Sequence, residues 1–231
     1  MFAAISGRYD LANHFLSGGY DYFWRRRAAR LVASWRPSRI LDLATGSGDL
    51  ALELRATCPA SLVVGADFCA PMLAEARRKG VTDLVAADAL NLPFADGSFD
   101  ALTVAFGLRN MDPWSRALAS AARVIRPGGH LLVIDFSVPP APLRWLYRPY
   151  LHHLLPRIAA FLTGQKAAYD YLGASIEAFP SGPAMCRLIE AAGFCDPKCE
   201  PLTGGIVSLY TATRSLMAAE DAASSLRQSV P

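Results

Sequence analysis

Short apolar runs alternate along residues 39–136 with stretches in which apolar positions recur every three to four residues. The short runs predict strands, and their nearly continuous apolar character is typical of strands buried on both faces. The longer stretches predict amphipathic helices that cover those faces. The expected strands are 39–44, 61–66, 83–87, 99–105 and 130–136, and the expected helices are 48–57, 70–79 and 113–125.

The pattern changes on either side of this alternating region. The first 35 residues predict a helix, with Leu31, Val32 and Trp35 on one face. Residues 139–180 carry many prolines and aromatic residues and predict a helical insertion. The remaining elements are a helix at 182–192 and two strands at 196–202 and 205–213, joined by a tight turn at Gly204–Gly205.

Strands that alternate with helices form right-handed βαβ units, so the chain is expected to build an α/β fold around a mostly parallel sheet. We expect a single domain over residues 1–214, in which residues 1–36 form an N-terminal helical lid. Residues 215–231 are rich in alanine and serine and are expected to form a flexible tail.

Composition and charge narrow the class of protein. Hydrophobic residues make up 52% of the 231 residues and charged residues 19%, which is typical of a folded domain. No apolar run reaches the roughly 18 residues of a membrane span, and the N-terminus lacks a signal-peptide pattern, so we expect a cytoplasmic protein. A net charge of +3 does not predict a nucleic-acid partner, and the five cysteines form no metal-ligand or disulfide pattern.

The sharpest local motif follows the first expected strand, where Gly46-Ser47-Gly48 leads into a helix. Glycines at such a turn let the backbone approach a ligand, and the helix N-terminus offers N–H groups without intrahelical partners. Asp67 ends the second expected strand, about 20 residues after Gly46, where a carboxylate accepts hydrogen bonds from a ribose diol. The motif therefore predicts an adenosine-type cofactor across the carboxyl ends of the first two strands.

The same spacing matches the dinucleotide pattern G-x-G-x-x-A, but neighbouring acids favour S-adenosylmethionine over NAD. Asp42 lies just before the glycines, where a carboxylate repels a pyrophosphate and attracts a cationic ligand. Asp88 and Ala89 follow the third strand, where a carboxylate accepts from an adenine amino group and a backbone N–H reaches a ring nitrogen. The chain also has no Tyr-x-x-x-Lys pair at any of its lysines.

Further sequence blocks accompany these motifs, within a stretch of similarity that spans residues 9–213. They are Tyr9–Asn13, Trp24–Arg26, Asp42–Leu50, Asp88–Phe94, Phe106–Asn110, Arg126–Gly129 and Tyr169–Pro180. With these blocks the chain resembles the ubiquinone/menaquinone biosynthesis C-methyltransferase family. The Phe106–Asn110 and Tyr169–Pro180 blocks are specific to that family, whereas the glycine and Asp-Ala blocks occur in many methyltransferases. Ala51 and Ala105 depart from the family, whose members often carry Thr and Ser there.

The resemblance implies a class I S-adenosylmethionine-dependent methyltransferase with a Rossmann-like, seven-stranded, mostly parallel sheet. The helical insertion would precede the last helix and the β-hairpin. The residues expected to bind S-adenosyl-L-methionine are Asp42, Gly46, Ser47, Gly48, Asp49, Asp67, Asp88 and Ala89.

The implied reaction is methylation of a ring carbon of a polyprenylated quinol, converting 2-demethylmenaquinol to menaquinol. A phenol is mostly protonated at neutral pH, so a permanent cation at Arg109 would stabilise the phenolate, and Asn110 would hold the second ring oxygen. On the substrate side, Tyr9, Asp10 and Asn13 would close over the site. Tyr171 and Ser175, one helical turn apart, would face it from the insertion.

The sequence is also compatible with another methyl acceptor and with other classes of protein. A 2-polyprenyl-6-methoxy-1,4-benzoquinol of ubiquinone biosynthesis is the alternative acceptor. From other classes, the alternatives are an NAD(P)-dependent reductase and a non-catalytic scaffold of a quinone-synthesis complex. We expect no metal, peripheral contact with membrane lipid at the inner face of the membrane, and either a homodimer or a place in such a complex.

Overall fold

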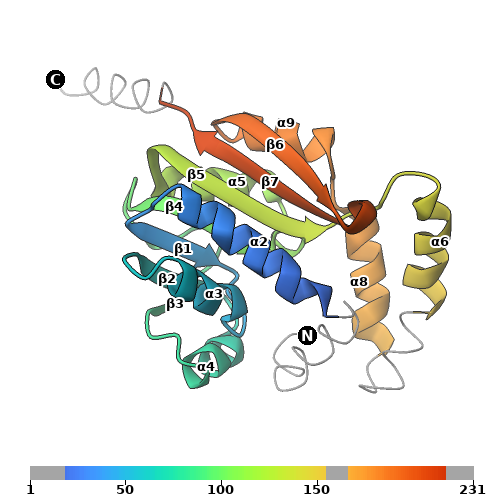
Figure 1. The fold of residues 1–231 in the computed structure, drawn as a ribbon, viewed down its shortest axis with the longest axis horizontal. Coiled ribbons are helices and arrows are strands. Elements are labelled where there is room, and N and C mark those ends of the chain that lie inside the picture. The colour runs from blue at the N-terminus through green and yellow to red at the C-terminus, as the bar shows by residue number, and fades with distance from the viewer. Residues whose placement is uncertain (1–18, 155–165, 217–231) are drawn as a thin grey trace.

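The computed structural model describes residues 19–154 and 166–216. Within them, seven strands form one sheet in the order β3-β2-β1-β4-β5-β7-β6, in which β7 alone runs in the opposite direction to the other six (Figure 1). The strands are β1 Arg39–Leu43, β2 Leu62–Asp67, β3 Leu84–Ala86, β4 Phe99–Ala105, β5 Ile125–Phe136, β6 Phe194–Leu202 and β7 Val207–Arg214. The expected α/β fold with a seven-stranded, mostly parallel sheet is confirmed.

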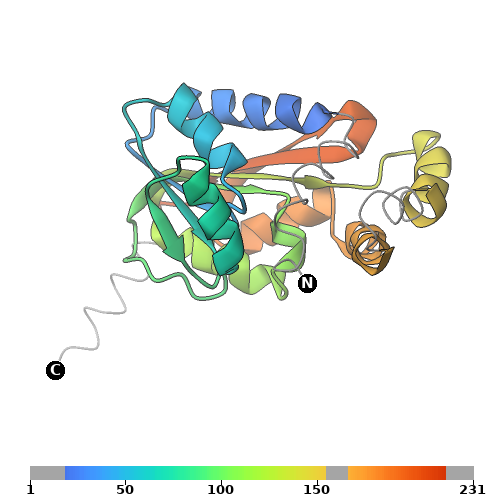
Figure 2. The same ribbon diagram turned by 90° about the horizontal axis from the view of Figure 1, so that it is seen from below.

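Helices cover both faces of this sheet. The helices are α2 Tyr20–Ser34, α3 Asp49–Thr57, α4 Ala70–Arg78, α5 Trp114–Val124, α6 Leu143–Pro149, α8 Lys166–Ala178 and α9 Pro183–Ala191. Short helical turns lie at η2 Leu108–Asn110, η3 Tyr150–Leu154 and η4 Thr203–Gly205. Figure 2 shows α2 and α3 on one face of the sheet and α5 and α9 on the other.

The two faces of the sheet enclose two hydrophobic layers. Along β1, Leu41 and Leu43 point to the layer of α5 and α9, whereas Ile40 points to the layer of α2, α3 and α4. This alternation follows from the two-residue period of a strand, and both sets are apolar because both faces are covered. The apolar runs of the sequence therefore identified the central strands correctly.

The N-terminal segment expected to form a lid contributes α2 to this core. Trp24, Ala28, Ala29 and Val32 are buried against the sheet, so residues 20–34 form a packed helix layer. Residues 1–18 lie outside the described part of the chain, as do residues 217–231 of the expected tail. The helical insertion supplies α6, η3 and α8, which stand beside the carboxyl end of the sheet (Figure 1).

The tight hairpin turn expected at Gly204–Gly205 is wrong. β6 and β7 pair Leu202 with Val207, so residues 203–206 form a wider connection that contains a 3-10 turn. Thr203, Gly204 and Gly205 all adopt positive φ there, at 48°, 68° and 90°. The wider turn has a packing role, because the Trp24 indole N–H donates to the Thr203 hydroxyl at 2.9 Å.

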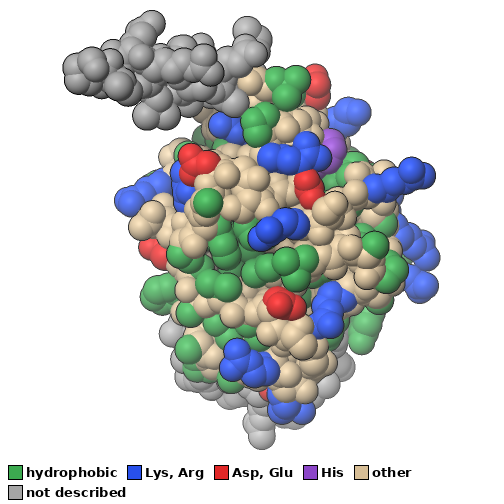
Figure 3. All heavy atoms as spheres, turned by 90° about the vertical axis from the view of Figure 1, so that its left-hand side faces the viewer, with side chains coloured by type: hydrophobic (Ala, Val, Ile, Leu, Met, Phe, Trp, Pro, Cys, Tyr) green, Lys and Arg blue, Asp and Glu red, His purple; other side chains and the backbone are tan. Residues whose placement is uncertain are grey.

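Charged side chains are spread over the face where the parallel strands begin, rather than gathered into one patch (Figure 3). Within the described residues, no helix combines the length and apolar content needed to cross a bilayer. The chemistry-bearing residues instead converge at the opposite edge, where the parallel strands end.

Candidate active site

A cavity of about 430 Å³ lies at the carboxyl ends of β1, β2 and β4. The strand order reverses between β1 and β4, and this switch point is where open α/β sheets bind ligands. The volume falls in the range of small-molecule sites. Many of the residues expected from the sequence to bind the cofactor or act on the substrate line this cavity. They are Asp42, Gly46, Ser47, Asp49, Asp67, Asp88, Ala89, Arg109 and Asn110.

The Gly46 turn is fastened to Asp67, the last residue of β2. Gly46 has a φ of 58°, and its N–H donates to Asp67 Oδ2 at 2.8 Å. The Cys69 N–H donates to the other carboxylate oxygen, Oδ1, also at 2.8 Å. A carboxylate offers about four lone-pair positions, so these two bonds leave one on each oxygen for a ligand. That arrangement suits a vicinal diol.

Asp42 is buried beneath this turn. Its two oxygens accept hydrogen bonds from the Thr45 hydroxyl at 2.6 Å and the Thr103 hydroxyl at 2.8 Å. Thr103 reaches it because β1 and β4 pair these two residues in register. Burial raises the pKa of Asp42 to about 6, although both hydroxyl bonds act in the opposite direction. Asp42 therefore supplies negative charge to the cavity above that pH.

Asp49 begins α3 and lies in an ion-pair network beside the turn. Lys79 Nζ lies 2.7 Å from Asp49 Oδ1 and donates to the Ser47 hydroxyl at 3.1 Å. Arg25 Nη1 lies 3.5 Å from the other oxygen, Asp49 Oδ2. The network thus ties the glycine turn to the end of α4 and to α2.

Gly48 is not among the residues that line the cavity. A Cβ on Gly48 would lie 2.6 Å from Val81 Cγ2 and 3.1 Å from Ala76 Cβ. Its φ of 86° also favours glycine. Gly48 therefore allows α3 to pack closely against the end of α4.

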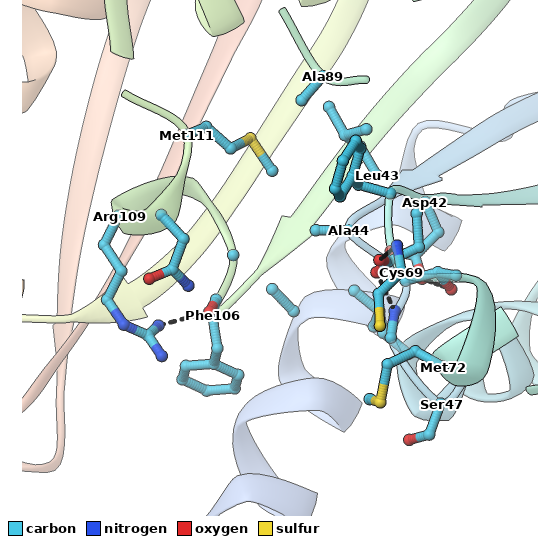
Figure 4. A pocket seen from close by; sticks show the side chains of 18 of the residues that line it. Asp42, Leu43, Ala44, Ser47, Cys69, Met72, Ala89, Phe106, Arg109 and Met111 are labelled. Carbon is cyan, nitrogen blue, oxygen red and sulfur yellow. Dashed lines mark hydrogen bonds between the residues drawn. The ribbon is translucent and has the colours of Figure 1, made fainter. Parts of the chain in front are cut away.

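Asp88 and Ala89 line a different part of the cavity, after β3. The Asp88 carboxylate accepts from the Leu90 N–H at 2.9 Å and remains exposed. Figure 4 places Ala89 at the opposite end of the view from Ser47. This end combines small apolar side chains with a solvent-facing carboxylate, which suits a flat heterocycle that carries an amino group.

Arg109 lies on the far side of the cavity, in the η2 turn after β4 (Figure 4). Its Nη1 donates to Asp135 Oδ1 at 2.6 Å and to the Phe106 carbonyl. The Arg109 side chain is 4% exposed and that of Asp135 is 0% exposed. Its guanidinium carbon lies 5.4 Å from the centre of the Phe136 ring. Arg109 is therefore a buried, anchored cation, with Asn110 next to it on the cavity wall.

Phe106 adopts a φ of 58°, which is unusual for an aromatic residue. The conformation aims its carbonyl at Arg109 while its ring lines the cavity. The Phe106 and Phe136 ring centres lie 5.0 Å apart, and those of Phe106 and Trp24 lie 5.9 Å apart. A strained residue of this kind is typical of functional sites.

The structure does not place every expected substrate residue. Tyr9, Asp10 and Asn13 lie outside the described residues. Tyr171 belongs to α8, but its side chain is also outside the described part. Ser175 donates to the Leu172 carbonyl at 2.8 Å and does not line the cavity. A role for these residues in substrate binding stays a prediction.

Other cavity residues have no counterpart among the expected site residues. Asp21, Arg25, Phe106 and Phe136 line the cavity, and Asp135 anchors Arg109 from below. Asp135 lies near the carboxyl end of β5, and this position, like those of Asp67 and Asp88 beside β2 and β3, is the sequence signal that could identify it. Of the two departures from the family pattern, Ala105 lines the cavity and Ala51 is buried in the core.

Comparison with known proteins identifies the fold and the family. Two solved structures share the fold at 20% identity: an S-adenosylmethionine-dependent methyltransferase from Thermotoga maritima and human N-acetylserotonin methyltransferase in complex with S-adenosylmethionine. The TM-scores are 0.65 and 0.59; the matches cover 93% of this chain in both cases, and 98% and 59% of the respective neighbours.

Closer relatives match by sequence. The demethylmenaquinone methyltransferase of Thermus thermophilus is 47% identical over 220 residues, which cover 93% of this chain and 100% of the relative. That of Deinococcus radiodurans is 42% identical, over 91% and 89% of the two chains. The model of the ubiE/COQ5 methyltransferase family matches residues 1–214, which include every cavity residue described above. The chain therefore belongs to the ubiE/COQ5 methyltransferase family.

Proposed function

We propose that this protein transfers the methyl group of S-adenosyl-L-methionine to a ring carbon of 2-demethylmenaquinol, which loses the ring hydrogen as a proton and yields menaquinol and S-adenosylhomocysteine. The observation that carries this proposal is one cavity with two different ends. One end is an acidic glycine turn with Asp42 and Asp67, and the other is the anchored cation Arg109. Such a cavity can hold a cationic methyl donor and an acidic phenol side by side.

The residues fit the cofactor. Asp67 has an acceptor position left on each carboxylate oxygen for the ribose hydroxyls. Asp88 and Ala89 would hold the adenine end, and Asp42 would supply negative charge near the sulfonium end. When bound, S-adenosyl-L-methionine supplies an electrophilic methyl group.

Arg109 and Asn110 would activate the acceptor. A phenol of pKa about 10 is mostly protonated at pH 7, and its ring carbon becomes a good nucleophile once the hydroxyl ionises. A guanidinium fixed by Asp135 and the Phe106 carbonyl meets the developing phenolate without reorganising. The amide of Asn110 would hold the second ring oxygen.

The choice of acceptor follows the relatives. Those of Thermus thermophilus and Deinococcus radiodurans are both named demethylmenaquinone methyltransferases, which favours the naphthoquinol over the benzoquinol of ubiquinone biosynthesis. Membership of a methyltransferase family rules out the NAD(P)-dependent reductase. Because Arg109 and Asn110 are both present at the cavity, we propose a working enzyme rather than a scaffold.

One experiment tests this function directly. The purified protein is incubated with labelled S-adenosylmethionine and either short-chain demethylmenaquinol or the demethylated benzoquinol. We expect label in the naphthoquinol at a rate that exceeds the benzoquinol rate. Label in neither quinol contradicts the proposed activity, and a faster benzoquinol reaction contradicts the proposed substrate.

We also propose that the protein works on the cytoplasmic side of a membrane and contacts its lipid. Trp145 and Leu146 on α6 are 73% and 75% exposed, and Arg144 and Arg148 on the same helix are exposed too. Apolar and basic side chains in this combination suit an anionic bilayer surface, in which a polyprenylated quinol is dissolved.

Sedimentation with vesicles tests this contact. Vesicles that contain phosphatidylglycerol should retain the protein, and Trp145→Ala with Leu146→Ala should release it, while Leu216→Ala serves as the matched exposed control. Equal retention of all variants contradicts the proposed contact. A homodimer or a quinone-synthesis complex is the remaining proposal about partners, and size-exclusion chromatography of purified and native extracts tests it.

A further inference from the structure

Among the described residues, two cationic side chains line the cavity, Arg25 and Arg109. They lie in different parts of it. Arg109 is anchored to Asp135 in the loop after β4. Arg25 comes from α2 and lies beside the glycine turn, because its Nη1 is 3.5 Å from Asp49, the first residue of α3.

The position of Arg25 is fixed from two sides. Its Nη1 donates to Asp21 Oδ2 at 2.6 Å, one helical turn earlier on α2, and Asp21 is buried. The neighbouring Trp24 is buried in the core, so this turn of α2 is held against the sheet. The guanidinium carbon lies 6.0 Å from the centre of the Phe106 ring. Arg25 therefore spans the space between the glycine turn and the loop after β4.

The guanidinium retains donors for a ligand. Both of its ion pairs use Nη1, and no hydrogen bond joins Nη2 or Nε to an acceptor within residues 19–154 and 166–216. A guanidinium has five N–H donors in a rigid fork that matches a carboxylate. The Arg25 side chain is 15% exposed, so a carboxylate bound to it would be largely shielded from water.

The cofactor carries one group for which the site residues above provide no partner. Asp67 suits the ribose and Asp42 suits positive charge, but the amino-acid end of S-adenosylmethionine also bears a carboxylate. Asp42 and Asp49 would repel that carboxylate. We propose that Arg25 binds the carboxylate of the cofactor's amino-acid end, with Asp21 as the residue that positions it. This inference rests on the proposed use of S-adenosylmethionine.

The test compares two ligands that differ at this end. S-adenosylhomocysteine carries the amino-acid end, whereas 5′-methylthioadenosine lacks it and keeps the adenosine part. Calorimetry measures both dissociation constants for the wild type and for Arg25→Gln. Loss of charged hydrogen bonds should weaken S-adenosylhomocysteine about 10- to 100-fold, and 5′-methylthioadenosine less than about twofold. Arg26→Gln is the matched control, because Arg26 is the exposed neighbour on α2 and does not line the cavity.

Two results overturn the proposal. One is an unchanged affinity of Arg25→Gln for S-adenosylhomocysteine, and the other is an equal loss for both ligands, which indicates a structural role. If Arg25→Gln does not fold, Arg25→Lys keeps the charge and gives the same comparison, with a selective loss again expected. Neither ligand involves the methyl acceptor, so these results are independent of whether demethylmenaquinol is the substrate.

Discussion

The guanidinium of Arg109 and the carboxylate of Asp135 form an ion pair of 2.6 Å in which neither side chain has appreciable contact with solvent. Asp135 also accepts from the backbone N–H groups of Arg109 and Phe136. A buried pair of this kind fixes geometry, because each charge is costly to bury without the other. The cation proposed to activate the quinol is therefore part of the framework of the site, and its orientation is set before any substrate arrives.

Breaking this pair should destabilise the protein strongly. Asp135→Asn leaves the Arg109 guanidinium buried without its carboxylate partner, at an expected cost of about 3–5 kcal/mol in the free energy of unfolding. The double variant Arg109→Gln, Asp135→Asn removes both charges and should recover much of this loss. Urea unfolding measures both effects.

The pair Arg126–Asp100, whose arginine is exposed, provides the control for this prediction. Its arginine side chain is 54% exposed, so Arg126→Gln should cost less than about 1 kcal/mol. An Asp135→Asn variant that is no less stable than Arg126→Gln would contradict the structural role of the buried pair.

Loss of the Arg109 charge should lower turnover, while cofactor affinity changes little. Removal of one preorganised electrostatic donor typically lowers the rate about 10²–10³-fold. The defect of Arg109→Gln should shrink as pH rises, because solvent then ionises the quinol without help from the arginine. Single-turnover methyl transfer between about pH 6.5 and 9.5 measures this. The double variant with Asp135→Asn separates catalysis from stability, and a flat pH profile of its rate defect argues against the catalytic role.

Substitution of Asp67 should weaken the binding of S-adenosylmethionine. Asp67→Ala removes the carboxylate that would accept from the ribose hydroxyls and that now accepts from the Gly46 and Cys69 N–H groups. We therefore expect the binding free energy of the cofactor to weaken by about 1.5–3 kcal/mol. Calorimetry compares the cofactor affinity of this variant with that of Asp83→Ala. Asp83 is an exposed acid that does not line the cavity. Equal affinities of the two variants would remove Asp67 from the site.

Cofactor binding should depend on pH through Asp42. Because its pKa is raised from 3.8 to about 6, the folded protein holds this proton at pH values where the unfolded chain has released it. The free energy of unfolding contributed by Asp42 therefore decreases as pH rises from about 4 to about 6 and is constant above that range. The ionised form attracts the cationic cofactor, so affinity should fall as pH is lowered through about 6.

Calorimetric titrations between about pH 5 and 8 check this dependence. Asp42→Asn should bind the cofactor more weakly at neutral pH and show little change with pH. A wild-type affinity that is constant across this range would exclude Asp42 as the titrating group.

The sequence predicted the central strands well because their apolar runs reflect burial on both faces. The run at 99–105 matches β4 at both ends, and the helix expected at 113–125 agrees with α5 to within a residue. The hairpin at Gly204–Gly205 was wrong because a glycine pair favours a tight turn locally, whereas the strand register and the contact between Trp24 and Thr203 require a longer one.

Site residues that lie at the end of a strand could be predicted from the sequence. Those that reach the cavity only through the packing of distant elements could not. Asp67 and Asp88, which both line the cavity, could be identified because Asp67 ends one strand and Asp88 follows the next. The pairing of Arg109 with Asp135, 26 residues away, depends on how β4 and β5 align, which no local pattern reveals. Arg25 reaches the cavity only because α2 packs across the sheet, so its role required the tertiary structure.

The loops after β1 and β4 pack closely against each other at Ala44 and Gly107. Ala44 and Phe106, the residues that follow these strands, both have positive φ, at 52° and 58°. A Cβ on Gly107 would lie only 2.6 Å from the Ala44 Cβ. The two loops are therefore so close that no side chain fits at position 107. In the proposed complex, with the donor against the loop after β1 and the acceptor against the loop after β4, main-chain packing would therefore set the distance between them. On that proposal, side chains on the acceptor wall can be exchanged to change which ring is accepted without altering this distance, which makes the scaffold a good starting point for redesigned acceptor specificity.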